Sequence, residues 1–192
     1  MRIIAGTWKG RRLDAPGWSG LRPTSDKLRE TLFNILAPRI VGARFLDGYA
    51  GTGAVGIEAL SRGAAQVTFV ERDPRAVRLI EGNLARCGLP ASAGGAERYA
   101  IIRAGFAGAG ERLAKDRFDI LFLDPPYGAA ELAGALRAAA PLVGERALLV
   151  VEHAKRDAAP AVFETLVRTR ELVSGDSALA FYTGRSIEDP HD

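Results

Sequence analysis

The chain has 192 residues, of which 47% are hydrophobic, so it can bury one sizeable core, and we expect one domain with an appendage. Cys87 is the single cysteine, which excludes an internal disulfide and leaves no paired spacing typical of a zinc site; we expect no metal. The opening apolar run is too short for a signal peptide, and no segment approaches the ~18 apolar residues of a membrane helix. We therefore expect a cytoplasmic protein with no membrane partner.

Positive charge is concentrated near the start of the chain. Residues 1–40 carry a net charge of +5 within a total of +3, so the other residues are net acidic, and both tryptophans, Trp8 and Trp18, lie in the same segment. Clustered cations gain affinity for a polyanion by releasing counterions from its phosphates. A nucleic-acid-binding arm is one interpretation, and a solvated surface with tryptophans packed on the core is the other, because charge alone does not separate them.

The first predicted elements are a small hairpin, a linker and a helix. Residues 2–5 and 11–13 flank a turn-like segment, which predicts the hairpin. Residues 16–23 are rich in Gly and Pro and are predicted as the linker. Apolar residues at helical spacing predict an amphipathic helix from about Thr24 to Ala37, with Thr24 or Ser25 as its N-cap, and Pro38 is expected to end it.

From residue 44 onward, short apolar runs alternate with helical patterns. We predict strands over residues 44–47, 66–71, 99–103, 118–124 and 147–152, and helices over residues 55–62, 74–87, 107–115 and 129–140. This alternation predicts an α/β fold with a mostly parallel sheet covered on both faces. Residues 162–173 and 177–183 run from strand to strand through a turn, so a terminal antiparallel hairpin completes seven strands, the arrangement of the class I, Rossmann-like methyltransferases.

We expect three segments in the chain: a basic arm over residues 1–22, a methyltransferase domain over residues 23–185 and a flexible tail over residues 186–192. The Gly/Ala-rich residues 89–96 are interpreted as a surface loop.

Residues 47–56 read DGYAGTGAVG and contain the pattern G-x-G-x-x-G where a strand gives way to a helix. Glycines there let the backbone approach a ligand at the carboxyl edge of the sheet, and any adenosine-containing cofactor could use this. Asp47 precedes the glycines; its carboxylate would repel a pyrophosphate but pair with the α-ammonium group of S-adenosylmethionine. Glu71 ends the second strand, where it can accept ribose hydroxyls, as acids in NAD sites also do. A simple turn carboxylate is the alternative for Asp47.

Asp124-Pro125-Pro126-Tyr127 directly follows the apolar run FDILFL. Two prolines withdraw two N–H donors, so the turn projects carbonyl oxygens. Together with a carboxylate and an exposed ring, these oxygens predict a receptor for a planar group that bears an NH2; a rigid turn after a core strand is the alternative. The motif resembles the D/N-P-P-Y/F motif of methyltransferases that act on exocyclic amines of nucleobases.

Six longer stretches of the sequence resemble one particular family of nucleobase methyltransferases. They are MRIIAGTWKGRRL, LRPTSDKLRETLFNIL, FLDGYAGTGAVGIEALSRGA, VERD, FLDPPYG and ALAFYTGR. Over nearly the whole chain and in order, these stretches resemble the RsmD-type family of 16S ribosomal RNA guanine-N2 methyltransferases. The resemblance implies S-adenosylmethionine as cofactor and a guanine of 16S rRNA, in an assembling small subunit, as substrate. We expect a monomer.

The resemblance also implies roles for individual residues. Asp47, Gly51 and Gly53 would hold the methionine end of the cofactor and Glu71 its ribose, and the segment from Arg22 to Arg29 would border the pocket. The family usually places an Asp near the adenine amine after the third strand. This chain has Arg103-Ala104-Gly105-Phe106 there, so backbone groups and stacking on Phe106 would replace it.

The predicted sites comprise three sets. The cofactor set is Asp47, Tyr49, Gly51, Gly53, Glu71, Arg72, Gly105, Phe106 and Asp124. The catalytic set is Asp124, Pro125, Pro126 and Tyr127, and the RNA-binding set is Trp8, Lys9, Arg11, Arg12 and Arg22.

The chemistry expected of the catalytic set follows from the weakness of guanine N2 as a nucleophile. Asp124 and the Pro125 carbonyl would accept its two hydrogens while Tyr127 stacks on the base. Three alternatives remain open: an adenine-N6 methyltransferase, which shares D-P-P-Y; an NAD-dependent oxidoreductase, which Asp47 disfavours; and a non-catalytic RNA-binding assembly factor.

Overall fold

The computed structural model describes residues 1–18, 25–89 and 98–185. The chain separates into two compact units, Met1–Ala109 and Gly110–Asp192, called the first and second unit below. Arg22, most of the predicted surface loop and the predicted tail lie outside the described residues. Within the described ranges, no helix is long and apolar enough to cross a bilayer.

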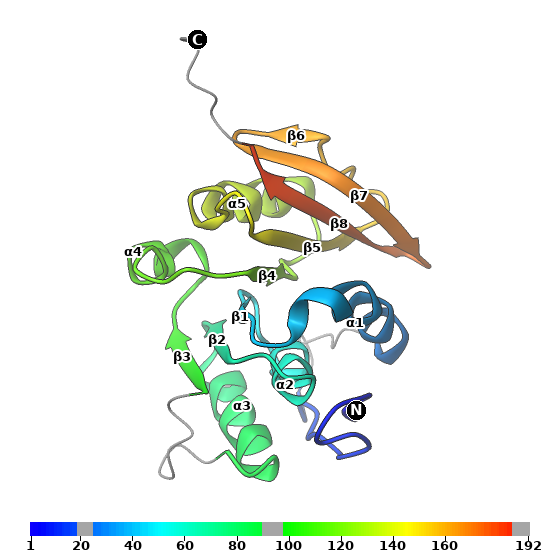
Figure 1. Ribbon diagram of the computed structural model, residues 1–192, viewed down its shortest axis with the longest axis vertical. Helices are drawn as coiled ribbons and strands as arrows, with labels where there is room; N and C mark the ends of the chain where they lie inside the picture. The colour runs from blue at the N-terminus through cyan, green and yellow to red at the C-terminus, as the bar shows by residue number, and fades with distance from the viewer. Residues whose placement is uncertain (19–24, 90–97, 186–192) are drawn as a thin grey trace. The chain divides into compact units, whose positions relative to one another are not determined.

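The predicted N-terminal hairpin is confirmed. The backbone N–H of Ile3 donates to the Arg11 carbonyl at 3.0 Å, and the Leu13 N–H donates to the Met1 carbonyl at 3.1 Å. Ile3 and Leu13 are buried, so two apolar side chains anchor the hairpin in the first unit. Figure 1 shows it in dark blue at the N-terminus.

Helix α1 (Asp26–Ile40) begins as expected but ends later than predicted. Ser25 is the N-cap, and its hydroxyl oxygen accepts a hydrogen bond from the Leu28 N–H at 3.2 Å. Pro38 lies inside the helix instead of ending it. A proline so near the C-terminus removes one helical hydrogen bond, and the buried Leu36 and Ile40 hold the last turn against the core.

The first unit contains three parallel strands in the order β3-β2-β1 (Figure 1). Their bounds, β1 (Arg44–Asp47), β2 (Gln66–Glu71) and β3 (Tyr99–Arg103), are the predicted ones. Helices α2 (Ala54–Ser61) and α3 (Pro74–Arg86) connect them, also close to prediction. The carboxyl ends of β1 and β2 therefore meet at one edge, where Asp47 and Glu71 stand.

The helix predicted over residues 107–115 does not form as one element. The structure has a 3₁₀ turn, η2 (Ala107–Ala109), and a single helical turn, α4 (Gly110–Leu113). Gly108 and Gly110 lower helix propensity here, because each glycine costs about 1 kcal/mol relative to alanine inside a helix.

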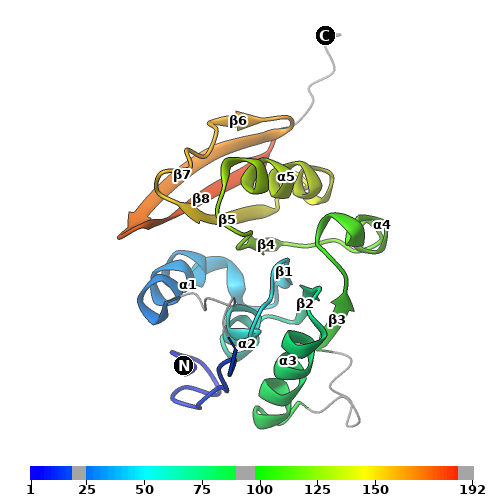
Figure 2. The ribbon, with the colours of Figure 1, turned by 180° about the vertical axis from the view of Figure 1, so that it is seen from behind.

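The second unit has two parallel strands followed by antiparallel ones. Strands β4 (Ile120–Leu123) and β5 (Leu148–Ala154) are parallel, and helix α5 (Ala129–Ala139) with the short η3 (Ala140–Leu142) connects them. Beyond β5 the order is β8, β7, β6, and each pair is antiparallel. Figure 2 shows this series of strands from behind. The predicted terminal hairpin is β7 with β8, and it is confirmed.

One predicted strand is divided in two. Residues 162–173 form β6 (Val162–Phe163) and β7 (Leu166–Ser174), while β8 spans Ser177–Gly184. Glu164 adopts a left-handed φ of 52° between β6 and β7, a conformation that no strand residue keeps. The described residues therefore hold eight strands, three in the first unit and five in the second, where seven were predicted.

Candidate active site

Asp47 ends strand β1 with its side chain almost completely buried. Its Oδ2 accepts a hydrogen bond from the Gly56 N–H at 2.9 Å. Burial raises the pKa of Asp47 to about 7; the Gly56 hydrogen bond opposes the increase, and the nearby charge of Glu71 adds to it. A buried carboxylate with this environment gains most from a cationic partner, because a positive charge offsets the cost of its desolvation.

The Glu71 carboxylate is hydrogen-bonded to the glycine loop, which is Gly51-Thr52-Gly53 between β1 and α2. Its Oε2 accepts from the Gly51 N–H at 2.9 Å, and its Oε1 accepts from the Asp73 N–H at 2.8 Å. Gly51 and Gly53 both have positive φ, 53° and 76°, which lets the chain turn tightly from β1 into α2. Each Glu71 oxygen keeps a second lone pair, so the carboxylate can still accept hydroxyl groups of a ribose.

The third glycine of the pattern has a packing role. A Cβ at Gly56 would overlap the ring of Phe69 on β2, so α2 and β2 are in direct contact at this point. Every residue of α2 is buried. Gly56 also donates its N–H to Asp47, which fixes the carboxylate relative to the helix.

Tyr49 and Phe106 form an aromatic pair in the first unit. Their ring centroids are 5.5 Å apart and the rings are tilted by 43°. Phe106 is buried and Tyr49 is half-buried, so Tyr49 is the more accessible ring. Burial raises the pKa of the Tyr49 phenol, and the charge of Arg72 opposes this. The predicted members Tyr49, Arg72 and Phe106 of the cofactor set are therefore neighbours, and Gly105 directly precedes Phe106 in the chain.

The Asp-Pro-Pro-Tyr turn follows β4 in the second unit. Pro125 is buried, Asp124 is half-buried, and Pro126 and Tyr127 are exposed. The phenol oxygen of Tyr127 lies 2.8 Å from the hydroxyl oxygen of Ser177. The turn thus presents an aromatic ring to solvent while a hydrogen bond restrains it. Sequence reasoning did not identify Ser177, because nothing local distinguishes it from other turn serines.

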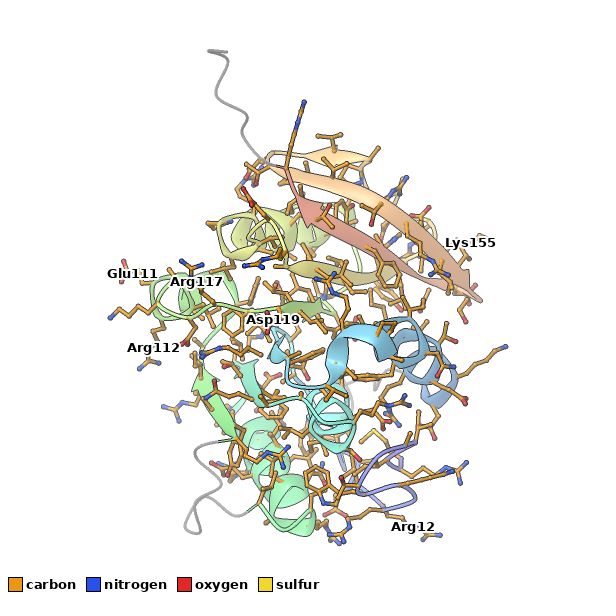
Figure 3. The ribbon with its side chains drawn as sticks, in the orientation of Figure 1. Arg12, Glu111, Arg112, Arg117, Asp119 and Lys155 are labelled. Atoms are coloured by element: carbon orange, nitrogen blue, oxygen red, sulfur yellow. The ribbon has the colours of Figure 1, made fainter. Side chains whose placement is uncertain are left out.

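The hairpin residues of the RNA-binding set are partly exposed. Lys9, Arg11 and Arg12 are exposed, whereas Trp8 is half-buried. The backbone N–H of Trp8 donates to the Ser61 hydroxyl at 3.0 Å. The Arg11 guanidinium also donates to the Arg86 carbonyl. Figure 3 shows Arg12 at the margin of the first unit.

Arg29 and Glu58 hold the hairpin against the first unit. Arg29, predicted to border the cofactor pocket, is completely buried and donates to the Arg2 carbonyl at 2.6 Å. Glu58 of α2, also completely buried, accepts from the Ile4 and Ala5 N–H groups at 2.8 and 3.0 Å. Sequence reasoning missed Glu58, although an acid in the apolar helix AVGIEALS is a usable signal of a buried polar contact.

Comparison with known proteins identifies relatives over nearly the whole chain. The profile of the family described as Conserved hypothetical protein 95 matches residues 1–183. Ribosomal RNA small subunit methyltransferase D of Escherichia coli (strain K12) is 40% identical over 186 residues, which cover 95% of this chain and 89% of the relative. The protein of the same name from Haemophilus influenzae is 41% identical over 157 residues, 81% of this chain and 79% of the relative.

Solved structures agree with the predicted fold class. Escherichia coli yhhF has a TM-score of 0.80 at 35% identity and covers 96% of this chain and 98% of its own. At 20% identity, the rRNA methyltransferase aviRa from Streptomyces viridochromogenes has a TM-score of 0.66, covers 88% of this chain and 87% of its own, and shows the shared fold alone. The expectation of a Rossmann-like methyltransferase fold is thereby confirmed. The chain belongs to the family described as Conserved hypothetical protein 95 and is a homologue of ribosomal RNA small subunit methyltransferase D.

Proposed function

We propose that the protein transfers a methyl group from S-adenosylmethionine to the exocyclic N2 amine of a guanine in 16S rRNA. The observation that carries the proposal is the Asp124–Tyr127 turn, which presents an exposed ring beside a carboxylate at the end of β4. It occurs in a chain 40% identical to a ribosomal RNA small subunit methyltransferase. An exposed ring is the feature that a base-stacking site needs and a purely structural turn does not.

The residues at the carboxyl ends of β1 and β2 fit the cofactor. The buried Asp47 carboxylate would pair with its α-ammonium group, and Glu71 would accept its ribose hydroxyls through lone pairs that Gly51 and Asp73 leave available. Tyr49 offers aromatic surface for its adenine, whereas the predicted stacking partner Phe106 is buried and packs against the Tyr49 ring. Bound there, the cofactor supplies an electrophilic methyl group on a sulfonium.

The Asp-Pro-Pro-Tyr turn would prepare the nucleophile. The lone pair of guanine N2 is delocalised into the ring, so the nitrogen must become pyramidal before it attacks. Asp124 and the Pro125 carbonyl would accept its two hydrogens and favour that geometry, with Tyr127 stacked on the base. After transfer, the excess proton on N2 leaves to the Asp124 carboxylate or to water.

The hairpin would position the RNA. A site for one base does not select a single guanine in a large RNA, so contacts elsewhere must do so. Lys9, Arg11 and Arg12 are exposed on the hairpin and would contact phosphates, and Arg22 is proposed to act with them. Trp8 would pack on a sugar or a base with the part of its ring that is exposed.

Methyl transfer from labelled S-adenosylmethionine to 16S rRNA tests the proposal. The RNA is offered both naked and in partly assembled small subunits, and mass mapping locates the modified nucleotide. We expect one guanine to gain one methyl group at N2. Label on adenine would instead support an adenine-N6 methyltransferase, and tight RNA binding without transfer would support an assembly factor.

A further inference from the structure

Asn83 is a buried polar residue on the apolar face of helix α3. It is completely inaccessible to solvent and lies between the buried Ile80 and Leu84. Burying a side-chain amide is costly unless its donors and acceptor are satisfied, so its partners indicate why it is there.

The Asn83 amide joins two distant segments of the first unit. Its Nδ2 donates to the Thr52 carbonyl at 3.0 Å and to the Asp14 carbonyl at 3.3 Å. Its Oδ1 accepts from the Asp14 N–H at 2.8 Å. Thr52 is the central residue of the glycine loop, and Asp14 directly follows the hairpin.

Two side chains therefore hold the glycine loop, one as an acceptor and the other as a donor of a hydrogen bond. Glu71 holds the Gly51 N–H, and Asn83 holds the carbonyl of the next residue, Thr52. Because Gly51 and Gly53 have little conformational preference of their own, the loop needs such external restraints to keep one shape. Without the Asn83 donor, the Thr52 carbonyl would lose its partner in a buried place.

We propose that Asn83 is a positioning residue for the cofactor, holding the Thr52 carbonyl so that the glycine loop keeps the conformation that receives the methionine end of S-adenosylmethionine. The same amide fixes the segment after the hairpin to that loop. This inference rests on the proposed function, because it takes the loop as the cofactor site. It adds a residue that makes no contact with the reacting groups.

Asn83→Asp tests the proposal with a nearly isosteric change. The carboxylate keeps an acceptor for the Asp14 N–H but loses both Nδ2 donations, to the Thr52 and Asp14 carbonyls, and places an oxygen against the Thr52 carbonyl. We expect the Kd and the KM for S-adenosylmethionine to rise about tenfold, the size that loss of the one buried hydrogen bond to the glycine loop gives. The kcat at saturating cofactor should stay within about twofold of the wild-type value.

Asp14→Ala is the matched control. It removes the exposed ion pair between Asp14 and Arg86, 2.9 Å long, and leaves the backbone groups that bind Asn83. The affinity for S-adenosylmethionine should then stay within about twofold of wild type. If the Asp variant does not fold, Asn83→Ala is measured in its place. It removes the amide, and alanine has a high helix propensity.

The outcomes separate this inference from the proposed function. Unchanged KM in the Asn83 variants, or reduced kcat with unchanged KM and a lower Tm, overturns the positioning role, as does failure of both variants to fold. A wild-type protein that binds S-adenosylmethionine but methylates no 16S rRNA overturns the proposed function alone, because calorimetry with the cofactor still tests Asn83.

Discussion

The phenol of Tyr127 and the hydroxyl of Ser177 are hydrogen-bonded at 2.8 Å, which ties the ring after the double proline to the first residue of β8. The two residues are 50 positions apart, so the orientation of a proposed base-stacking ring depends on the terminal hairpin.

Ser177→Ala should lower the single-turnover rate on 16S rRNA by about two- to tenfold, because a hydrogen bond of this kind contributes about 0.5–1.5 kcal/mol. Tyr127→Phe removes the same bond and should have a similar effect, and the double variant should be no slower than either single one. Ser174→Ala, at the last residue of β7 across the β7–β8 turn from Ser177, is the control and should react at the wild-type rate. Additive effects would contradict a shared bond.

Asp124→Ala should reduce kcat by about 10²–10³, because the carboxylate is proposed to engage the amine chiefly in the transition state. The Kd for S-adenosylmethionine, measured by calorimetry, should change far less. Glu131→Gln, at an exposed acid in the first turn of α5, controls for general disturbance near the turn. A near-normal kcat in the Asp124 variant would remove Asp124 from the mechanism.

Glu71→Gln should raise the KM for S-adenosylmethionine about tenfold or more, with a smaller effect on kcat. The amide would present a donor to the N–H of Gly51 or of Asp73, so the loop and the ribose site are disturbed together. Glu81→Gln changes an exposed acid on α3 and should leave KM as it is. Equal KM values for the two variants would argue against the ribose role.

The titration of Asp47 should make stability depend on pH. Burial raises its pKa from 3.8 to about 7, so between these values the folded state binds more protons than the unfolded state. The contribution of Asp47 to the free energy of unfolding therefore falls as pH rises from about 4 to about 7, by on the order of 4 kcal/mol, and is flat above. Denaturant unfolding at pH 4 and pH 8 measures this.

Asp47→Asn provides the comparison, since its amide does not titrate. The difference in unfolding free energy between variant and wild type should grow in favour of the variant with rising pH, then stop growing near pH 7. Cofactor binding should show the opposite trend, because the ammonium requires the ionised carboxylate: affinity in the wild type should increase up to about pH 7, with proton release. A pH-independent difference would contradict the burial argument.

Replacing Lys9, Arg11 and Arg12 together with Ala should weaken RNA binding and flatten its salt dependence by roughly 0.7–0.9 log unit for each phosphate that the variant no longer neutralises. Affinity for S-adenosylmethionine and thermal stability should stay close to wild type. A triple Ala variant of Arg112, Lys115 and Arg117, exposed cations of the second unit, matches the charge change; Figure 3 labels the two arginines. An equal decrease of RNA affinity in both variants would contradict a specific role for the hairpin.

The sequence was most informative where local patterns decide structure. The three strands of the first unit were predicted with their bounds, because each is a short apolar run between polar turn residues. Pro38 was misjudged because the rule for proline concerns helix interiors, and the buried Ile40 stabilises one more turn. The left-handed Glu164 had no local signal, since glutamate rarely adopts that conformation.

The candidate site was predictable only in its chemical groups. Asp47 and Glu71 could be identified because acids at strand ends share one edge of a parallel sheet. Their backbone partners could not, because Gly56 and Gly51 are fixed by how α2 packs on β2. The sequence does carry a signal for Asn83, because an amide on the apolar face of an amphipathic helix indicates a buried polar contact.

The contact between the hairpin and α2 limits how these proteins can be recombined. Ser61 at the end of α2 receives the N–H groups of Thr7 and Trp8 through its carbonyl and hydroxyl oxygens, and its hydroxyl donates to the Ala5 carbonyl at 2.7 Å. The hydrogen bonds from Glu58 and Ser61 go to backbone groups of the hairpin, so a hairpin of another sequence can form them wherever position 58 is Glu and position 61 is Ser. A hairpin exchange between two homologues therefore has to keep Glu58 and Ser61 in the recipient, because without them altered RNA preference would be confounded with misfolding.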